Sequence, residues 1–176
     1  MKSQDMFQNS YANETIYKTD TATSNFADAT KYIWKGGTKT ILVNAAVLNT
    51  TYIRLPEATT DNAGLIVKVI YALSPAALHH VGFVTSLIVG GANTVGAAAE
   101  GNAPTDAGMA SSAVGTANLR LDLDVNVVGK AGGHPGTELE FYYTGVANVV
   151  IFKGSMHADV DDSTLANLYS TTAVNA

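Results

Sequence analysis

The sequence predicts an all-β protein, an antiparallel β-sandwich of about eight strands in a jelly-roll or other Greek-key order, with an extended N-terminal arm. Three observations predict this fold. Short β-branched and aromatic runs recur between turn signals, one run alternates strictly between apolar and polar residues, and the chain has neither a βαβ rhythm nor a long amphipathic helix. Its 176 residues are enough for one domain with a substantial core.

Residues 1–30 form the predicted arm, a polar and aperiodic segment that carries widely spaced large apolar residues. A frayed tail is one interpretation of this segment. The other is an arm that docks on a partner and becomes ordered on binding, which accounts for the apolar residues as anchors. The predicted anchors are Phe7, Tyr11, Ile16, Tyr17 and Phe26.

The strand domain, residues 31–154, begins with short runs of β-forming residues. Lys31–Trp34 is aromatic and precedes a Gly-Gly pair, which is a turn signal of the hairpin type. Thr40–Leu48 is rich in β-branched residues, and Thr51–Leu55 alternates and ends before a proline. Proline lacks an N–H group and is typical of a strand end or edge.

Two apolar runs and a low-complexity segment follow. Leu65–Leu73 is nearly continuous, which predicts either a central strand buried on both faces or a strand at a subunit contact. Val81–Val89 predicts another strand, closed by two glycines. Residues 90–118 consist mostly of small residues. They predict either a flexible surface loop or a loop packed on a neighbouring subunit, and part of the segment can form a short strand or turn.

The last part of the domain contains the clearest strand. Leu119–Val127 alternates over nine residues, so its leucines and valines face one side and its charged residues the other, wet side. Thr137–Thr144 and Val146–Lys153 predict a hairpin around a glycine. Residues 155–176 form the predicted C-terminal tail, in which Asp162–Tyr169 can form one or two turns of helix.

Composition excludes several classes of function. A net charge of −5 with only two arginines argues against nucleic-acid binding, which requires a basic face. The absence of cysteine excludes disulfides, thiolate metal sites and cysteine nucleophiles. No signal peptide is readable, and every apolar run is shorter than the roughly 20 residues that span a bilayer. We therefore expect a protein made in a cytoplasm, without a membrane partner.

The histidines do not form a recognisable metal or catalytic motif. His79 and His80 are adjacent, so in a strand they point to opposite faces and rarely bind one metal ion. His134 lies in a glycine-rich turn, and His157 is isolated. Exposed or internally satisfied imidazoles are the simpler interpretation. We expect no catalytic residue, no cofactor site and no metal site.

Two acidic patterns offer alternatives to that expectation. The cluster Asp159, Asp161 and Asp162 is either a calcium-binding loop or a solvated acidic turn, and it lacks the glycine and closing glutamate of an EF-hand. Asp122 and Asp124 lie about 7 Å apart on one strand face, a separation used by some glycosidases. Decoration of a solvated strand is the simpler interpretation of this pair.

The stretch Thr51–Ile70 resembles a pattern found in phage and viral virion proteins, a strand ending in Leu-Pro, a small-residue turn, and then Ala-Gly before an apolar strand. Gly136–Gly145 and Val149–Gly154 resemble the strand pair that closes such β domains. The resemblance implies a capsid decoration, cement or fibre-type module, often trimeric and without catalytic residues. The matching positions, expected to form a structural hairpin, are Leu55, Pro56, Ala58, Ala63 and Gly64.

The resulting expectation is a virion structural protein that decorates or cements a capsid. Its partners would be the major capsid protein or other virion proteins, together with its own copies, with a homotrimer favoured and assembly in a host cytoplasm. The alternative is a receptor- or glycan-binding fibre or adhesin module, with Trp34, Tyr142 and Tyr143 as exposed aromatics around a groove. A third hypothesis is a hydrolase that uses Asp122 and Asp124.

Overall fold

The computed structural model describes residues 14–18, 29–44, 50–73, 78–96, 107–112, 120–123, 133–158 and 170–172. These residues contain eleven strands and a single turn of 3-10 helix, η1 (Thr60–Asn62). A seven-stranded sheet contains β1 (Glu14–Lys18), β2 (Thr38–Val43), β4 (Ile66–Tyr71), β6 (Leu87–Gly96), β7 (Ala107–Ser112), β9 (Glu138–Tyr143) and β10 (Val149–Ala158). A four-stranded sheet contains β3 (Thr51–Arg54), β5 (His79–Gly82), β8 (Arg120–Leu123) and β11 (Ser170–Thr172).

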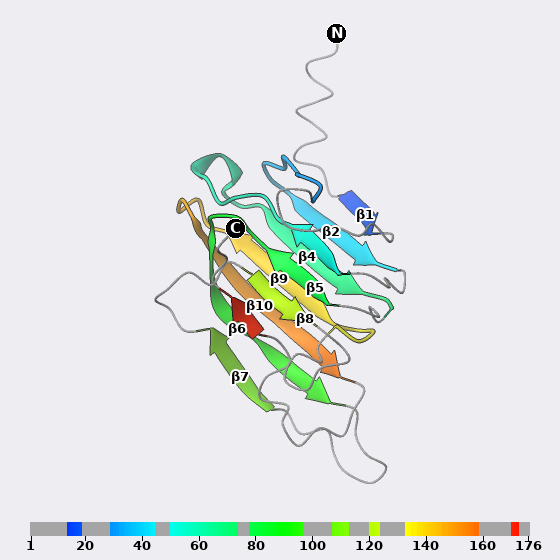
Figure 1. The fold of residues 1–176 in the computed structure, drawn as a ribbon. Helices are drawn as coiled ribbons and strands as arrows, with labels where there is room; N and C mark the ends of the chain where they lie inside the picture. The colour runs from blue at the N-terminus through cyan, green and yellow to red at the C-terminus, as the bar shows by residue number, and fades with distance from the viewer. Residues whose placement is uncertain are drawn as a thin grey trace.

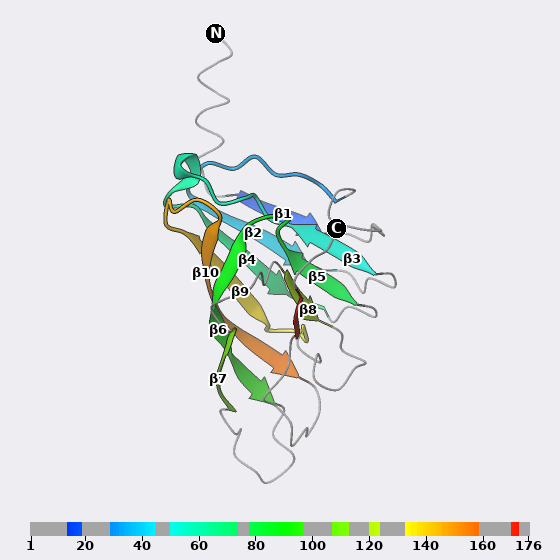
Figure 2. The ribbon, with the colours of Figure 1, turned by 60° about the vertical axis from the view of Figure 1, so that its left-hand side comes forward.

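The two sheets lie as two layers, which Figure 2 shows from the side. The strand order is β1-β2-β4-β9-β10-β6-β7 in the large sheet and β11-β8-β5-β3 in the small one (Figure 1). Alternate residues of each layer point into one shared core, because side chains in a strand alternate between faces. Phe83, just after β5, meets Phe141 of β9 edge-on at 6.0 Å, and Phe141 packs on Phe152 of β10 at 5.2 Å.

The all-β prediction is confirmed, but the expectation of purely antiparallel pairing is wrong. β2 runs parallel to both β1 and β4, β6 runs parallel to β10, and β3 runs parallel to β5. The chain passes from β3 in the small sheet to β4 in the large sheet, returns to β5, and passes again to β6. Such crossovers, unlike tight hairpins, produce parallel neighbours. An antiparallel jelly roll of about eight strands is therefore not confirmed.

The predicted strand Val81–Val89 is two strands in different sheets. β5 ends at Gly82, and β6 begins at Leu87 and continues through the expected stop to Gly96. Gly90 has a φ of 130°, and a Cβ atom there would lie 2.0 Å from the carbonyl oxygen of Phe152. This glycine lets β10 approach β6 closely and does not end the strand. β7 and the part of β6 from Gly90 onward also pair within residues 90–118.

The other predicted elements fit the structure to different degrees. The hairpin of β9 and β10 is confirmed, although β10 continues past the expected boundary to Ala158. Lys31–Trp34 is not a strand, and the Leu65–Leu73 run is buried on one face of β4 only. β1 and β11 place strands within the predicted arm and tail, whereas the expected helix at Asp162–Tyr169 lies outside the described residues. No helix in the described ranges is long and apolar enough to cross a membrane.

Candidate functional site

The face of the large sheet that points away from the small sheet carries the candidate functional site. β4 and β9 alternate between buried core residues and half-buried outward residues, and β10 continues this alternation. Strand register aligns the outward residues into a three-by-three grid across β4, β9 and β10. We call this grid the outer sheet face, and its rows are Ile66, Tyr142 and Ile151; Lys68, Glu140 and Lys153; and Ile70, Glu138 and Ser155.

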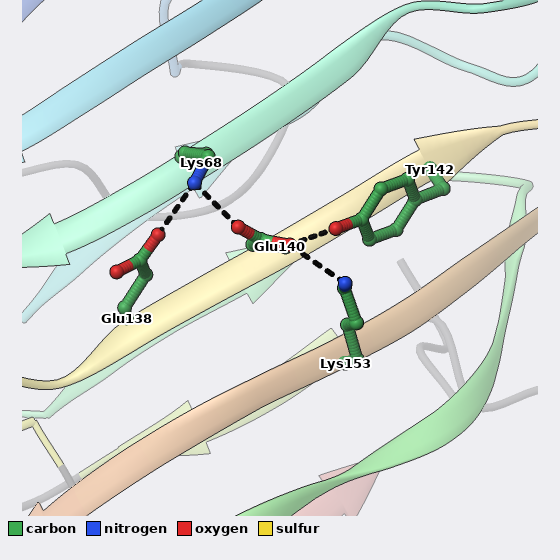
Figure 3. A network of polar contacts seen from close by, with 5 residues as sticks. All are labelled: Lys68, Glu138, Glu140, Tyr142 and Lys153. Carbon is green, nitrogen blue, oxygen red and sulfur yellow. Dashed lines mark hydrogen bonds and ion pairs between the residues drawn. The ribbon is translucent and has the colours of Figure 1, made fainter.

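Charged residues of the outer sheet face form one connected network (Figure 3). Lys68 Nζ lies 2.7 Å from Glu138 Oε1 and 2.5 Å from Glu140 Oε1. Lys153 Nζ lies 3.4 Å from Glu140 Oε2, and the Tyr142 hydroxyl donates a hydrogen bond to the same oxygen. Lys153 also lies over the Tyr142 ring, 4.7 Å from its centre. The two lysines and two glutamates leave this network without net charge.

Glu140 is the centre of the network. Burial alone would raise the pKa of Glu140, but the hydrogen bonds and charges of Lys68 and Lys153 outweigh burial and lower this pKa below 4.5. Hydrogen bonds to Glu138 and Glu140 raise the pKa of Lys68 above 10.5. Glu140 and Lys68 are therefore both charged at neutral pH, and their ion pair joins β9 to β4.

Apolar residues flank the charged row. Ile66 and Tyr142 are half-buried, and Ile151 is 46% exposed although it lies in the middle of a strand pairing. Monomeric proteins generally keep such contiguous apolar surface small, and larger partly apolar surfaces mark contact sites. The outer sheet face therefore presents one exposed and two half-buried apolar side chains beside the charge network.

The small sheet contains a second polar arrangement, formed by Asp122, His80 and Arg120. The sequence pattern predicted that Asp122 would lie on a solvent-exposed strand face. Asp122 of β8 is 3% exposed, and its Oδ1 atom lies 2.5 Å from Nδ1 of His80, its register partner on β5. Since a carboxylate only accepts hydrogen bonds, His80 donates from Nδ1. Arg120 Nε lies 2.8 Å from the same oxygen, and the Tyr52 ring packs on His80 at 4.3 Å. The expectation that Asp122 decorates the surface is wrong.

The adjacent histidines do point to opposite faces, as predicted. His79 faces the core, where its Nδ1 atom lies 3.5 Å from the hydroxyl of the fully buried Tyr71. His80 faces the other way, toward Asp122. Within the described ranges, no group of three or more histidine, aspartate or glutamate side chains is placed to hold a metal ion.

The Leu-Pro segment joins the two sheets and does not form the expected hairpin, because β3 and β4 belong to different sheets. Leu55 and Ala58 are buried, and the Pro56 carbonyl accepts a hydrogen bond from the Tyr143 hydroxyl. Gly64 donates from its N–H to the Tyr143 carbonyl, and Ala63 lies so close to Gly145 that a Cβ there would be 2.9 Å from it. The motif therefore lies in the connection between the two sheets.

Glu57, inside this motif, clamps the β5–β6 loop. Its carboxylate accepts hydrogen bonds from the backbone N–H groups of Val84, Thr85 and Ser86 and from the Thr85 and Ser86 hydroxyls, at 2.7 to 3.1 Å. Burial alone would raise the pKa of Glu57, but these hydrogen bonds outweigh burial and lower it below 4.5. The carboxylate therefore stays ionised and holds two connections between the sheets together.

The remaining predicted residues are placed as follows. Of the arm anchors, Ile16 and Tyr17 lie in β1, opposite Ile41 and Leu42 of β2. Phe7, Tyr11 and Phe26 lie outside the described residues, as do Asp124 and the acidic cluster at Asp159, Asp161 and Asp162.

The aromatic groove expected for glycan binding does not appear among the described residues. Trp34 is 8% exposed and stacks on Tyr32 at 4.3 Å, and Tyr143 is 2% exposed, so both belong to the core. Tyr142 alone of the three predicted aromatics lies on the outer sheet face. The prediction of exposed aromatics is therefore wrong for Trp34 and Tyr143.

Sequence reasoning missed the roles of Lys68, Glu57 and His80. Lys68 had a usable signal, because a lysine inside an otherwise apolar run marks the solvent face of a strand. Glu57 and His80 had none, because their partners are 27 to 42 residues away in the sequence. Comparison of the chain with protein families, with curated proteins and with solved structures gives no match.

Proposed function

We propose that the protein is a virion structural protein, a two-sheet β module that decorates or cements a capsid shell and associates with its own copies. The observation that carries this proposal is the outer sheet face, where half-buried and exposed apolar residues surround a neutral charge network. Protein–protein contacts combine apolar area with polar groups in this way.

The use of the ionisable groups supports a structural role. Asp122 and His80 are paired with each other, and Glu57 accepts five hydrogen bonds from a neighbouring loop. Asp122 and His80 are also almost completely buried, so a substrate would have little access to either group. We therefore propose that the protein is not an enzyme and acts through its surfaces.

Residues 1–30 are the proposed tether to the major capsid protein or other virion proteins. Within them β1 adds a strand to one edge of the large sheet, and this pairing would fix the point where the tether leaves the module. The resemblance to virion modules favours a homotrimer in a particle assembled in a host cytoplasm. A jelly-roll or other Greek-key relationship to those modules stays a prediction.

Co-sedimentation with particles isolated from the source of the protein tests this function. The full chain is expected to pellet with the particles, and a variant that lacks residues 1–30 is expected to stay in the supernatant. Circular dichroism of the shortened variant must still show β structure. Binding that is undiminished by the deletion would remove the tether from the proposal, and a full chain that never pellets would overturn the function.

A further inference from the structure

We propose that the outer sheet face binds a second copy of this chain, with the two faces related by a two-fold axis that runs along the strands between β9 and β10. This inference rests on the proposed self-association, and it replaces the homotrimer that the resemblance favours with a two-fold dimer. It depends on the register of β9 and β10 and on the charges that the two strands present.

Each outward residue of β9 has a partner of complementary kind on β10. Tyr142 lies opposite Ile151, Glu140 opposite Lys153, and Glu138 opposite Ser155. A two-fold axis between the strands places β9 of one copy over β10 of the other at the same height. Glu140 then faces the lysine of the second copy, while Ile151 faces the tyrosine, so every contact is made twice.

The geometry of sheet packing permits this contact. Two sheets that pack face to face lie about 10 Å apart with strands inclined at about 30°. Because the inclination moves distant strands apart, the residues next to the axis make the contact, and these are the residues of β9 and β10. Lys153 is available for it, since its side chain is 63% exposed and its ion pair to Glu140 is long at 3.4 Å.

Charge selects a second copy as the occupant. The chain carries a net charge of −5, so two copies repel one another over most of their surfaces. The four charges of the outer sheet face cancel: next to the axis, β9 carries Glu138 and Glu140 and β10 carries Lys153, while Lys68 lies one strand further out on β4. In a copy turned about the axis, each Glu140 meets the Lys153 of the other copy, so both positions face opposite charge. An acidic partner would place like charge on Glu140, and a basic partner would place like charge on Lys153.

A charge-exchange experiment tests the contact. In Lys153→Glu, two glutamates face each other across the axis, and in Glu140→Lys, two lysines do so. Each variant alone is expected to dissociate at least about tenfold more readily than the wild type in sedimentation velocity, because like charges oppose at both positions. An equimolar mixture of the two variants restores opposite charges, and it is expected to form a mixed dimer of near wild-type affinity.

Ile151→Asp provides a second test that does not alter the network, and it is also expected to give monomers. The matched control is Val146→Asp, because Val146 is 58% exposed but lies in the turn between β9 and β10. Unchanged native mass in Lys153→Glu and Ile151→Asp would overturn the proposal. A wild-type trimer or monomer, or a mixture that stays dissociated, would overturn it as well.

Particle binding separates this inference from the proposed function. If Ile151→Asp is monomeric but still pellets with particles through its arm, the two-fold contact holds and the function holds with it. If the same variant keeps its native mass and loses particle binding, the outer sheet face binds the shell, and the two-fold contact is wrong. If the wild type dimerises through this face but never pellets, the contact holds and the function fails.

Discussion

Asp122 and His80 face each other across β8 and β5, with 2.5 Å between the carboxylate oxygen and Nδ1 of the ring. Both side chains are almost completely buried. A buried carboxylate without a partner is costly, so the pair constrains how the two strands align. The register of the small sheet is therefore held by a polar contact as well as by its apolar core residues.

Removing one member of this pair is expected to destabilise the protein strongly. Asp122→Ala leaves the His80 N–H group buried without its acceptor, which should lower the free energy of unfolding by about 3 kcal/mol or more. Urea unfolding followed by circular dichroism measures the change. Asp61→Ala is the control, because Asp61 is exposed, and it should cost less than about 0.5 kcal/mol. Equal effects of the two substitutions would show that the pair does not stabilise the fold.

The Glu57 clamp predicts a second large effect. Glu57→Gln keeps the size of the side chain but removes its charge and one acceptor oxygen, and we expect a loss of about 2 kcal/mol in the free energy of unfolding. Glu138→Gln is the matched control, since Glu138 is 39% exposed and its surface ion pair contributes less than about 1 kcal/mol. A loss no greater than that of the control would contradict the clamp.

The same carboxylate predicts a pH dependence. Because folding lowers the pKa of Glu57 below 4.5, its contribution to stability is complete above pH 4.5 and is lost as the pH falls through the folded-state value. The difference in unfolding free energy between wild type and Glu57→Gln should therefore shrink on acidification below pH 4.5. A difference that stays constant from pH 6 to pH 3 would show that the folded-state pKa is not lowered.

Two glycines with positive φ angles should respond differently to alanine. At Gly90 a Cβ atom would lie 2.0 Å from the backbone oxygen of Phe152, so β6 and β10 must separate, and we expect a loss of more than about 2 kcal/mol. Gly64 has a φ of 82° and nothing within 4 Å of an added Cβ, so only backbone strain of about 1 kcal/mol is expected. Thermal unfolding compares the two variants. A milder effect at Gly90 would contradict the observed approach of the strands.

Lys68 is expected to control the ionisation of Glu140. Lys68→Met removes the 2.5 Å ion pair, so the pKa of Glu140 should rise, because burial is then opposed mainly by Lys153. Carboxyl-carbon NMR titration measures this pKa. Lys153→Met is the matched control and should produce a smaller rise, since its ion pair is 3.4 Å long. A larger rise in the control would reverse the assigned roles of the two lysines.

Local patterns in the sequence were enough to predict an all-β protein and the β9–β10 hairpin, but not the mixed pairing of the two sheets. Alternation around Phe141 and a glycine between two β-rich runs specify a hairpin locally, and the structure confirms it. Pairing between sheets depends on crossovers, which leave no local pattern. For this reason Gly90 was predicted to end a strand. In the structure it lies inside β6, where the carbonyl oxygen of Phe152, 62 residues later in β10, leaves no room for a Cβ atom.

The outer sheet face was only partly predictable. A lysine inside an apolar run is a usable signal for a solvated strand face, but the Leu65–Leu73 run was predicted to be buried on both faces or at a subunit contact, and the grid depends on β4 and β10 both pairing with β9. Asp122 was predicted to be solvent-exposed because it lies on the polar side of an alternating strand. Alternation distinguishes the two faces of a strand, but it does not show whether the polar face is covered by other parts of the protein. Its burial at 3% exposure depends on tertiary contacts.

The most direct test of the proposed function is the protein composition of purified particles. Quantitative mass spectrometry of particles banded on a density gradient should find this chain at a fixed ratio to the major shell protein, and washing in buffers that leave the shell intact should not change that ratio. A chain that remains in the soluble fraction, with none in the particle band, would contradict the proposed role in the virion.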